Sequence, residues 1–401
     1  MENIAMMHPM KNPLKYDVAI VGAGLVGASL AAALKDSGLC VALIEAGMPQ
    51  QPSASQDIWD SRIYAISPGS REFLEQTGAW QRMDKGRIAP VEAMRIFGDS
   101  NSRLDLTAYQ AGVTELACIL ENSALQHALW QQLQQQENLT LYCPARCARL
   151  TSSDACATLE LEDGRMLTAN LIVGADGRNS WVRNQAGIGS APVDYRQHGV
   201  VANFSCERPH RGIAHQWFCE DGILALLPLP GKRVSMVWSV SPETSATLLS
   251  LTPEQLACRV AAASQHTLGE LAVITNAAAF PLRLLTLPQI SAQRVALIGD
   301  AAHNMHPLAG QGVNTGFRDA KQLAQLLIFR GGCSDCGDAA LLRRYDRKRA
   351  EDIRTMQATT YGLKNLFCND DPLLRALRNA GLNAVDHMNP VKKLLMQHAV
   401  H

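Results

Sequence analysis

A glycine-rich stretch near the carboxyl third of the chain carries groups suited to holding a large polar ligand. Residues 295–319 begin with a short apolar run, continue through Gly299 and Asp300, and reach a turn rich in glycine before a helical pattern starts near Val313. Asp300 would stand at the carboxyl end of a strand, where an acid can accept hydrogen bonds from ligand hydroxyls. Backbone N–H groups of residues 310–314 can face an anionic or electron-rich group. An ordinary strand-helix connection is the alternative for this stretch alone.

A second candidate site stands near the amino terminus and has the spacing of a dinucleotide-binding turn. Gly22, Gly24 and Gly27 form a G-x-G-x-x-G pattern directly after the apolar residues 18–21. Such glycines allow a tight turn, close approach of a pyrophosphate and close packing of the helix on the strand. Glu45 follows the next apolar run at the offset where an acid binds a ribose. The pattern predicts a βαβ unit that binds an adenine dinucleotide.

A third turn has the same character. Residues 171–174 read as a buried strand, Asp176 and Gly177 fall in the turn after it, and Ser180 is placed to cap a helix. A tight turn that needs Asp and Gly only for its backbone is the alternative.

Two further polar side chains are candidates for ligand contact. Arg62 precedes an apolar run and could bind a phosphate with both arms of its guanidinium, although a solvated surface arginine fits equally well. Gln126 lies in the first turns of a helix whose apolar face carries Leu125, Leu129 and Leu133. It could touch a cofactor, whereas a solvent-facing amide is the default.

The elements that would position these residues define an α/β protein. We predict a Rossmann-like domain with a parallel sheet and an inserted, mainly antiparallel sheet formed by residues 197–206, 214–218, 223–229 and 234–240. Trp217, Phe218 and Trp238 could line a cavity there, but aromatic residues in strands more often belong to the core. The predicted segments are 1–80, 113–190 and 289–345 for the first domain, 81–112 and 191–288 for the inserted substrate domain, and 346–401 for a helical carboxyl-terminal region.

Size and charge exclude several classes of protein. The 401 residues exceed what one core usually supports, and 37 Lys and Arg balance 37 Asp and Glu, without the basic excess typical of nucleic-acid binding. Residues 18–34 are uncharged but contain Gly22, Gly24 and Gly27, the glycines of the dinucleotide-binding fingerprint. We therefore expect no transmembrane span. The first sixteen residues include Glu2 and lack an apolar signal core, which favours a cytoplasmic location.

Cysteine and histidine usage predicts no metal site. Eleven scattered cysteines suit reduced thiols better than a disulfide framework. Cys333 and Cys336 form a C-x-x-C in an apparent surface loop, but a second pair at zinc spacing is missing. His303 and His306 lack a nearby carboxylate cluster, so hydrogen-bonding roles fit them better than a metal.

The three turns in this order resemble the FAD-dependent aromatic-ring hydroxylases, the family of 4-hydroxybenzoate hydroxylase. The likeness extends over most of residues 16–350. More narrowly, residues 303–314, 121–130 and 174–183 are similar to the bacterial ubiquinone-biosynthesis hydroxylases, and residues 221–229 with 237–242 to the member that hydroxylates a polyprenylphenol at ring carbon 5. The chain departs from the commoner pattern at Asn304, Met305, Thr315 and Arg318.

The resemblance implies a role for each motif. The fingerprint glycines would face the FAD pyrophosphate, Glu45 the adenosine ribose, Arg62 and Gln126 the phosphate and ribityl side, and Asp300 the ribityl chain. The Asp176-Gly177 turn is associated in the family with FAD and NAD(P)H. Residues against the reacting flavin ring, and hence the candidate catalytic set, are His306, Pro307, Gly310, Gln311 and Gly312, with Val313 and Asn314 as further cofactor contacts.

The implied reaction places the chemistry on the cofactor. NAD(P)H, bound only transiently because one G-x-G-x-x-G is present, would reduce FAD; O₂ would add at flavin C4a, and the hydroperoxide would hydroxylate an electron-rich phenol. The site must exclude water. Alternatives are another ring position (C6 or C1), a non-prenylated phenol, a halogenase or prenyl reductase on the same scaffold, and a non-catalytic flavoprotein of an assembly.

The carboxyl-terminal tail suggests where a lipid-tailed substrate would be met. Residues 371–401 alternate apolar pairs with Arg375, Arg378, Lys392 and Lys393 at helical spacing. A basic amphipathic helix can lie on an anionic membrane or a partner, while a helix packed on its own domain is the commoner case. We therefore expect a polyprenylated phenol as substrate, other ubiquinone-biosynthesis proteins as candidate partners, and peripheral contact with the inner membrane.

Overall fold

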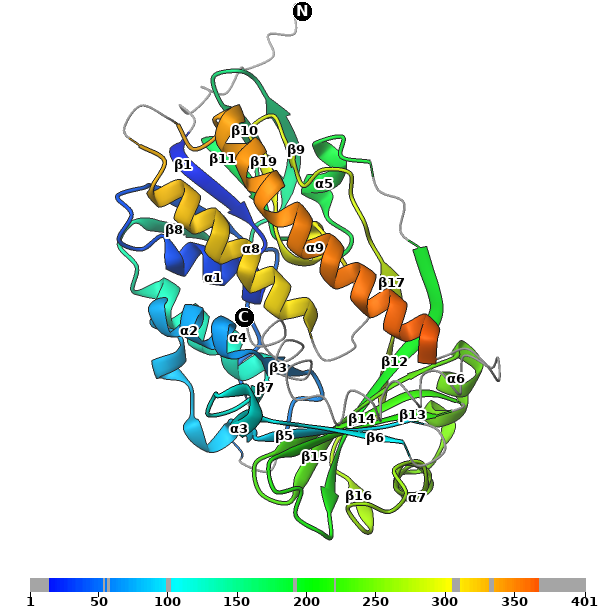
Figure 1. Ribbon diagram of the computed structural model, residues 1–401. Helices are drawn as coiled ribbons and strands as arrows, with labels where there is room; N and C mark the ends of the chain where they lie inside the picture. Colours follow the sequence, from blue (N-terminus) through cyan, green and yellow to red (C-terminus); the bar gives the residue numbers. More distant parts are fainter. Residues whose placement is uncertain are drawn as a thin grey trace, which may run out of the picture.

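The computed structural model describes residues 14–52, 55, 58–98, 102–189, 193–219, 221–304, 311–331 and 335–367. The predictions for Met305, His306, Pro307, Gly310, Cys333 and the tail 371–401 therefore lie outside the described residues. Figure 1 shows two layered parts: a sheet covered by the long helices α8 and α9, and a second sheet beside β3 and β7. This arrangement confirms the predicted α/β class with an antiparallel second part.

The first sheet holds the fingerprint motifs. Its strands run in the order β18-β19-β11-β1-β2-β8, with β10 and β9 continuing from β11. The central pairs β1/β11, β1/β2, β2/β8 and β11/β19 are parallel, which suits apolar runs buried on both faces. The strands are β1 (Leu14–Val21), β2 (Val41–Ile44), β8 (Leu139–Tyr142), β9 (Cys147–Ser152), β10 (Ala157–Leu161), β11 (Met166–Gly174), β18 (Ser291–Ala292) and β19 (Val295–Leu297). Residues 171–174, predicted as a buried strand, form the end of the longer strand β11.

A local capping signal in the sequence marks the start of one helix of this part. Ser67 accepts a hydrogen bond from the Ser70 N–H, and Pro68 takes the first helical position of the helix that follows. The long helix near the carboxyl terminus covers Ala339–Phe367. No helix among the described ranges is long and apolar enough to span a bilayer. The helices of this part are α1 (Leu25–Ala33), α2 (Pro68–Gln76), α3 (Ala108–Ala111), α4 (Asn122–Gln134), α5 (Trp181–Gln185), α8 (Gln311–Ile328) and α9 (Ala339–Phe367), with 3-10 turns η1 (Trp80–Arg82), η2 (Lys85–Arg87) and η3 (Gly299–Ala301).

The second sheet has the order β16-β12-β15-β14-β13-β5-β6, and β17 also pairs with β12. Helices α6 and α7 were not predicted, although Ser241-Pro242 and Thr252-Pro253 are cap-and-proline signals that mark their starts. A small sheet, β3-β7-β4, joins the two parts. The remaining elements are β3 (Ile63–Ile66), β4 (Ala89–Val91), β5 (Ala93–Phe97), β6 (Arg103–Thr107), β7 (Ala117–Glu121), β12 (Val193–Cys206), β13 (Ile213–Cys219), β14 (Gly222–Leu229), β15 (Arg233–Val240), α6 (Pro242–Ser250), α7 (Pro253–Ala263), β16 (Leu271–Val273) and β17 (Ala278–Leu284).

Alternation along β15 separates a core face from a cavity face. Met236 and Trp238 pack in the core cluster beneath α6 and α7, whereas Ser235 and Val237 line a cavity on the other side. Trp217 belongs to the same core cluster as Trp238. The preferred interpretation of these two tryptophans as core residues is therefore confirmed.

Candidate active site

One large cavity lies between the two sheets and collects most of the motifs. Its volume is about 860 Å³, within the size range of small-molecule and cofactor sites. The first part contributes residues of its three turns, and the second part contributes one face of its sheet. The residues with predicted roles that line it are Gly24, Arg62, Gln126, Gly177, Asp300, Gly312, Val313 and Asn314.

The fingerprint turn has the backbone that the three glycines allow. Gly22 adopts φ +102°, and a Cβ there would lie 2.5 Å from the Ala175 carbonyl oxygen. A Cβ on Gly27 would lie 2.0 Å from the Gly22 carbonyl oxygen, so helix α1 could not approach β1 with any other residue. Gly24 is the amino-terminal cap of α1 and lines the cavity. The end of α1 thus presents backbone N–H groups to the cavity, as a pyrophosphate site requires.

Glu45 and Asp176 both make hydrogen bonds within the protein. Glu45 accepts hydrogen bonds from the backbone N–H groups of Ala23, at 2.7 Å, and Gly47, at 3.1 Å. It therefore stands beside the fingerprint turn, although it does not line the cavity. The Asp176 carboxylate accepts hydrogen bonds from the Ser180 hydroxyl, at 2.6 Å, and from the Val182 N–H, at 3.0 Å. This second acid caps α5, which supports the backbone interpretation of its turn, while Gly177 faces the cavity.

Arg62 and Gln126 both reach the cavity, but from different directions. The Gln126 side-chain amide donates to the Ala23 carbonyl at 2.6 Å and so ties α4 to the fingerprint turn. The Arg62 guanidinium lies 5.5 Å from the centre of the Tyr64 ring. Burial raises the pKa of Tyr64, and the charge of Asp300 acts in the same direction. Tyr64 was not singled out from the sequence. It lines the cavity together with Arg62 and Asp300, which were.

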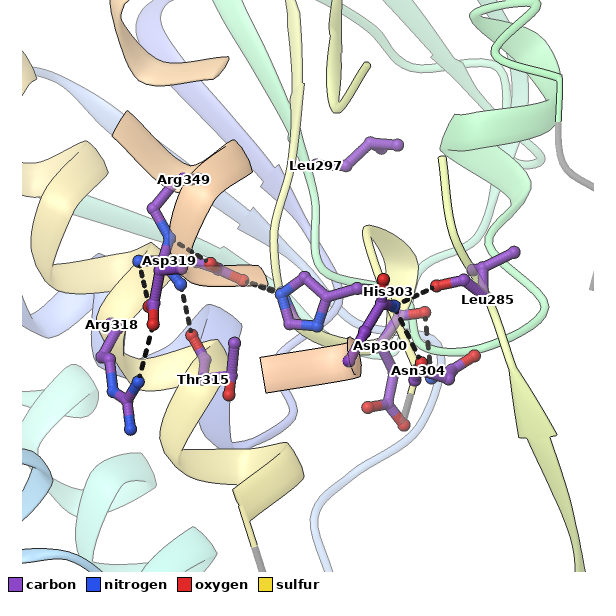
Figure 2. A network of polar contacts seen from close by, with 12 residues as sticks. Leu285, Leu297, Asp300, His303, Asn304, Thr315, Arg318, Asp319 and Arg349 are labelled. Carbon is purple, nitrogen blue, oxygen red and sulfur yellow. Dashed lines mark hydrogen bonds and ion pairs between the residues drawn. The ribbon is translucent and has the colours of Figure 1, made fainter. Parts of the chain in front are cut away.

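Asp300 stands on the short turn η3, and its carboxylate is exposed on the cavity side. Figure 2 shows that carboxylate pointing away from the polar network behind the turn. Arg183, which also lines the cavity, fixes the turn, because its guanidinium donates to the carbonyls of Ala301 and Arg178, each at 3.0 Å. The turn therefore presents an acid to the cavity from a backbone held in place by neighbouring elements.

A buried network of charges lies behind η3. The carboxylate of Asp319, which is fully buried, bonds to His303 Nε2 at 2.6 Å and to Arg349 Nε at 2.6 Å. The same carboxylate accepts the Gly299 N–H at 2.9 Å, at the start of the turn. Burial alone would raise the pKa of Asp319, but His303 and Arg349 outweigh burial and hold that pKa below its ordinary value.

The network extends to positions where the sequence departs from the family pattern. Arg349 also bonds Asp352 at 2.7 Å and the Thr315 carbonyl at 3.4 Å, and Arg318 bonds Asp352 at 3.0 Å (Figure 2). Thr315 and Arg318, two of the four departures, thus support the network behind η3. Sequence reasoning missed Asp319 and Arg349, because a buried ion pair between two helices leaves no periodic signal.

The helix that follows the glycine turn is anchored by Asn314. Its side-chain oxygen accepts the Ser67 N–H at 2.9 Å, and its amide donates to the Ala65 carbonyl at 2.9 Å. Asn314 therefore clamps α8 to β3, while Gly312 and Val313 face the cavity beside it. Gln311 begins α8.

The wall formed by the second sheet is mostly apolar. Val201, Ala225, Leu227 and Val237 lie on it, and Phe280 adds an aromatic ring from β17. An apolar wall opposite a polar turn suits a ligand that has a polar group at one end and a hydrocarbon part at the other.

The residues present fit FAD. The cavity joins the amino-terminal end of α1 to the Asp300 turn, so an extended dinucleotide could lie with its pyrophosphate on the helix end and its hydroxyls on the acid. Within the described ranges, His, Cys, Asp and Glu nowhere gather in a group of three or more that could hold a metal ion.

This fold and cavity define a flavin-binding enzyme of the two-part α/β type, and comparisons with known proteins identify its family. The family described as "FAD binding domain" matches residues 15–360. Ubiquinone hydroxylase UbiL of Rhodospirillum rubrum is 36% identical over 96% of this chain and 89% of its own length. The 3-demethoxyubiquinol 3-hydroxylase of Escherichia coli is 34% identical over 96% of this chain and 98% of its own.

A solved structure shows the same fold. PqsL, a probable FAD-dependent monooxygenase from Pseudomonas aeruginosa, matches with a TM-score of 0.76 at 22% identity, over 92% of this chain and 99% of that chain. The chain belongs to the FAD-dependent aromatic-ring hydroxylases, in the branch that contains the ubiquinone-biosynthesis hydroxylases. It is an FAD-dependent monooxygenase, with NAD(P)H and O₂ as the co-substrates of this class.

Asp300→Ala is expected to weaken FAD binding by about 10- to 100-fold, because hydrogen bonds to a charged group contribute about 1.5–3 kcal/mol. The turn itself should persist, since Asp319 and Arg183 hydrogen-bond to its backbone at Gly299 and Ala301. Fluorescence titration of apoprotein with FAD measures the effect, and Asp36→Asn, at an exposed surface position, serves as control. Wild-type affinity and flavin spectrum in Asp300→Ala would show that this acid does not bind the cofactor.

Proposed function

We propose that this enzyme hydroxylates the aromatic ring of a polyprenylphenol intermediate of ubiquinone biosynthesis, with ring carbon 5 as the favoured position. The observation that carries the proposal is the apolar wall of the second sheet, which faces the Asp300 turn across one cavity. Relatives whose names refer to ubiquinone and demethoxyubiquinol cover nearly the whole chain. The similarity of residues 221–229 and 237–242 to the carbon-5 hydroxylase supports the ring position.

The predicted site residues divide the work in this proposal. Gly24 and the end of α1 hold the pyrophosphate, Glu45 the ribose, and Arg62 and Gln126 the phosphate and ribityl side. Asp300 binds the ribityl hydroxyls, and the Asp176-Gly177 turn closes the site near the nicotinamide co-substrate. When bound and reduced, FAD activates O₂ for transfer to the ring. Residues beside the reacting ring are proposed to be His306, Pro307, Gly310, Gln311 and Gly312, with Val313 and Asn314 behind them.

The apolar wall has a chemical purpose in this reaction. Val201, Leu227, Val237 and Phe280 exclude water from the ring and offer contact to a hydrocarbon tail. Water that reached the activated oxygen would divert it to hydrogen peroxide, so this wall should couple NAD(P)H oxidation to ring hydroxylation. Among the described residues that line the cavity, the wall offers no cysteine nucleophile, and the proposed reaction requires none.

The decisive experiment restores hydroxylation in living cells. Bacterial strains that each lack one ring hydroxylase are expected to regain the missing product only where the ring position matches, which quinone mass spectrometry measures. Restoration in the strain lacking the carbon-5 enzyme supports that position, and restoration in another strain reassigns it. If no strain changes its quinone intermediates while the protein is present and yellow, the polyprenylphenol assignment fails.

Two arms of the same experiment address the remaining alternatives. NAD(P)H consumption by purified protein, with and without a polyprenylphenol, distinguishes a hydroxylase from a non-catalytic flavoprotein of an assembly. Removal of residues 371–401 tests the proposed peripheral membrane contact. Full activity on detergent-dispersed substrate, with reduced activity on substrate in anionic vesicles, is expected if these residues bring the enzyme to lipid.

A further inference from the structure

The cavity face of the second sheet contains a continuous row of side chains across four strands. Val201 of β12 pairs with Val237 of β15, Val237 with Ala225 of β14, and Ala225 with Gln216 of β13. All four residues line the cavity. The row is therefore apolar over three strands and ends in one carboxamide.

Two serines flank this row on β15. Ser235 and Ser239 lie two residues before and after Val237, so both point to the same face. Ser235 is fully buried and its hydroxyl has no hydrogen-bond partner within the described part of the chain. Gln216 and Ser239 are 6% and 3% exposed, and neither side chain bonds another described residue.

Buried polar groups in folded proteins nearly always have partners, so the unpartnered Ser235 hydroxyl points to a ligand. The side chains of Gln216 and Ser239 line the same cavity and offer further polar atoms to it. Ala225 stands next to Gln216 in the row, and its single methyl group leaves depth for a flat ring. The neighbouring His215 also lines the cavity, and its Nδ1 has no partner within the described part of the chain. Its ring stacks on the core residue Trp217 and on Phe97, and burial, with the charge of Arg95, lowers its pKa to about 4.

We propose that Gln216, together with Ser235 and Ser239, is the polar subsite that binds the oxygen substituents of the substrate ring and fixes which ring carbon is presented for hydroxylation. This inference rests on the proposed function and names the residues that determine its specificity. The prenyl tail then lies along the apolar remainder of the wall, toward Phe280 and Leu282.

The spacing of the three groups lets one ring meet Gln216 and one of the two serines at a time. Ser235 and Ser239 are about 13 Å apart along β15, and Gln216 lies about 10 Å across the sheet from Val237, from strand rise and strand separation. The long Gln216 side chain shortens this gap, so a ring seated over Ala225 meets a carboxamide at one edge and a hydroxyl at another. Two or more fixed contacts hold a ring in one orientation, whereas an apolar pocket alone discriminates weakly.

Gln216→Leu is the variant that tests this subsite, because leucine keeps much of the volume and removes both polar atoms. We expect it to weaken binding of a short-chain 2-polyprenylphenol about five- to tenfold, since one neutral hydrogen bond is lost. Binding of the matching polyprenylbenzene, which has no ring oxygen, should stay unchanged. Perturbation of the oxidised flavin spectrum measures both affinities, and product analysis should show more hydrogen peroxide per NAD(P)H and a second hydroxylated isomer.

Three comparisons make the outcome decisive. Gln325→Leu, on an exposed position of α8, is the matched control and should behave as the wild type. Ser239→Ala provides a second variant with a smaller change and should also weaken binding of the phenol but not of the polyprenylbenzene. An equal loss for both compounds, or no loss for the phenol in both variants, overturns the subsite. A wild type that binds no polyprenylphenol at all contradicts the proposed function instead.

Discussion

Asp319→Asn is expected to lower the free energy of unfolding by about 3–5 kcal/mol, because it removes one partner of a buried ion pair and leaves the other without compensation. Asp319 is fully buried, and its carboxylate joins His303, Arg349 and the Gly299 N–H. Asparagine cannot accept all three hydrogen bonds, since one of its two terminal atoms is a donor. For a chain of 401 residues, this loss of stability corresponds to a fall in Tm of about 4–6 °C.

The loss should also reach the cofactor, because Gly299 begins the turn that carries Asp300. Thermal unfolding followed by flavin release measures both effects. Asp36→Asn, which disturbs only an exposed pair with Lys35, is the matched control and should change Tm by little. Arg349→Met combined with Asp319→Asn should cost less than the sum of the single changes, and additive losses would contradict coupling within the network.

The same network should make the stability of the folded enzyme depend on pH in the acid range. The folded pKa of Asp319 lies below its ordinary value, so its stabilising contribution is present above the unfolded pKa of about 3.9 and is lost as pH falls through the folded value. The wild type should therefore lose more stability than Asp319→Asn on acidification below about pH 4.

The second large effect concerns the fingerprint turn and separates packing from ligand contact. Gly27→Ala places a Cβ 2.0 Å from the Gly22 carbonyl oxygen and 2.8 Å from the Ala175 methyl carbon. The backbone must move to relieve this contact, and such overpacking costs about 1–3 kcal/mol, with larger values in rigid places. We expect a destabilised, colourless protein. Gly24→Ala, where a Cβ meets no protein atom within 4 Å, should fold normally and bind FAD at least tenfold more weakly.

Tm of the two apoproteins and their FAD affinities distinguish these causes. Gly362→Ala, on α9, is the control and should be neutral or slightly stabilising, because alanine favours a helix over glycine by about 1 kcal/mol. If Gly27→Ala unfolds at the wild-type temperature, the close contact between α1 and β1 is not required. If Gly24→Ala binds FAD as tightly as the wild type, the pyrophosphate does not lie on this turn.

The sequence by itself determined the cofactor-binding scaffold, because its signals are local. The spacing of Gly22, Gly24 and Gly27 between an apolar strand and an Ala-rich helix specifies a turn whose backbone follows from the missing Cβ atoms. The cap at Ser67 and the acid Asp300 after a short strand are equally local. Each of these features depends only on residues within one turn or at one strand end. The sequence pattern is therefore enough to predict it.

Only the tertiary structure decided how the site is held and where a substrate would lie. Asp319 and Arg349 come from different helices, 30 residues apart in the sequence, so only packing brings their charges together behind the turn. On β15, alternation alone could not tell whether Trp238 or the neighbouring serines face the cavity, because either face of a strand can be the core. Helices α6 and α7 cover the face of the second sheet that carries Trp238. Ser235, Ser239 and Gln216 therefore lie on the opposite face, which lines the cavity.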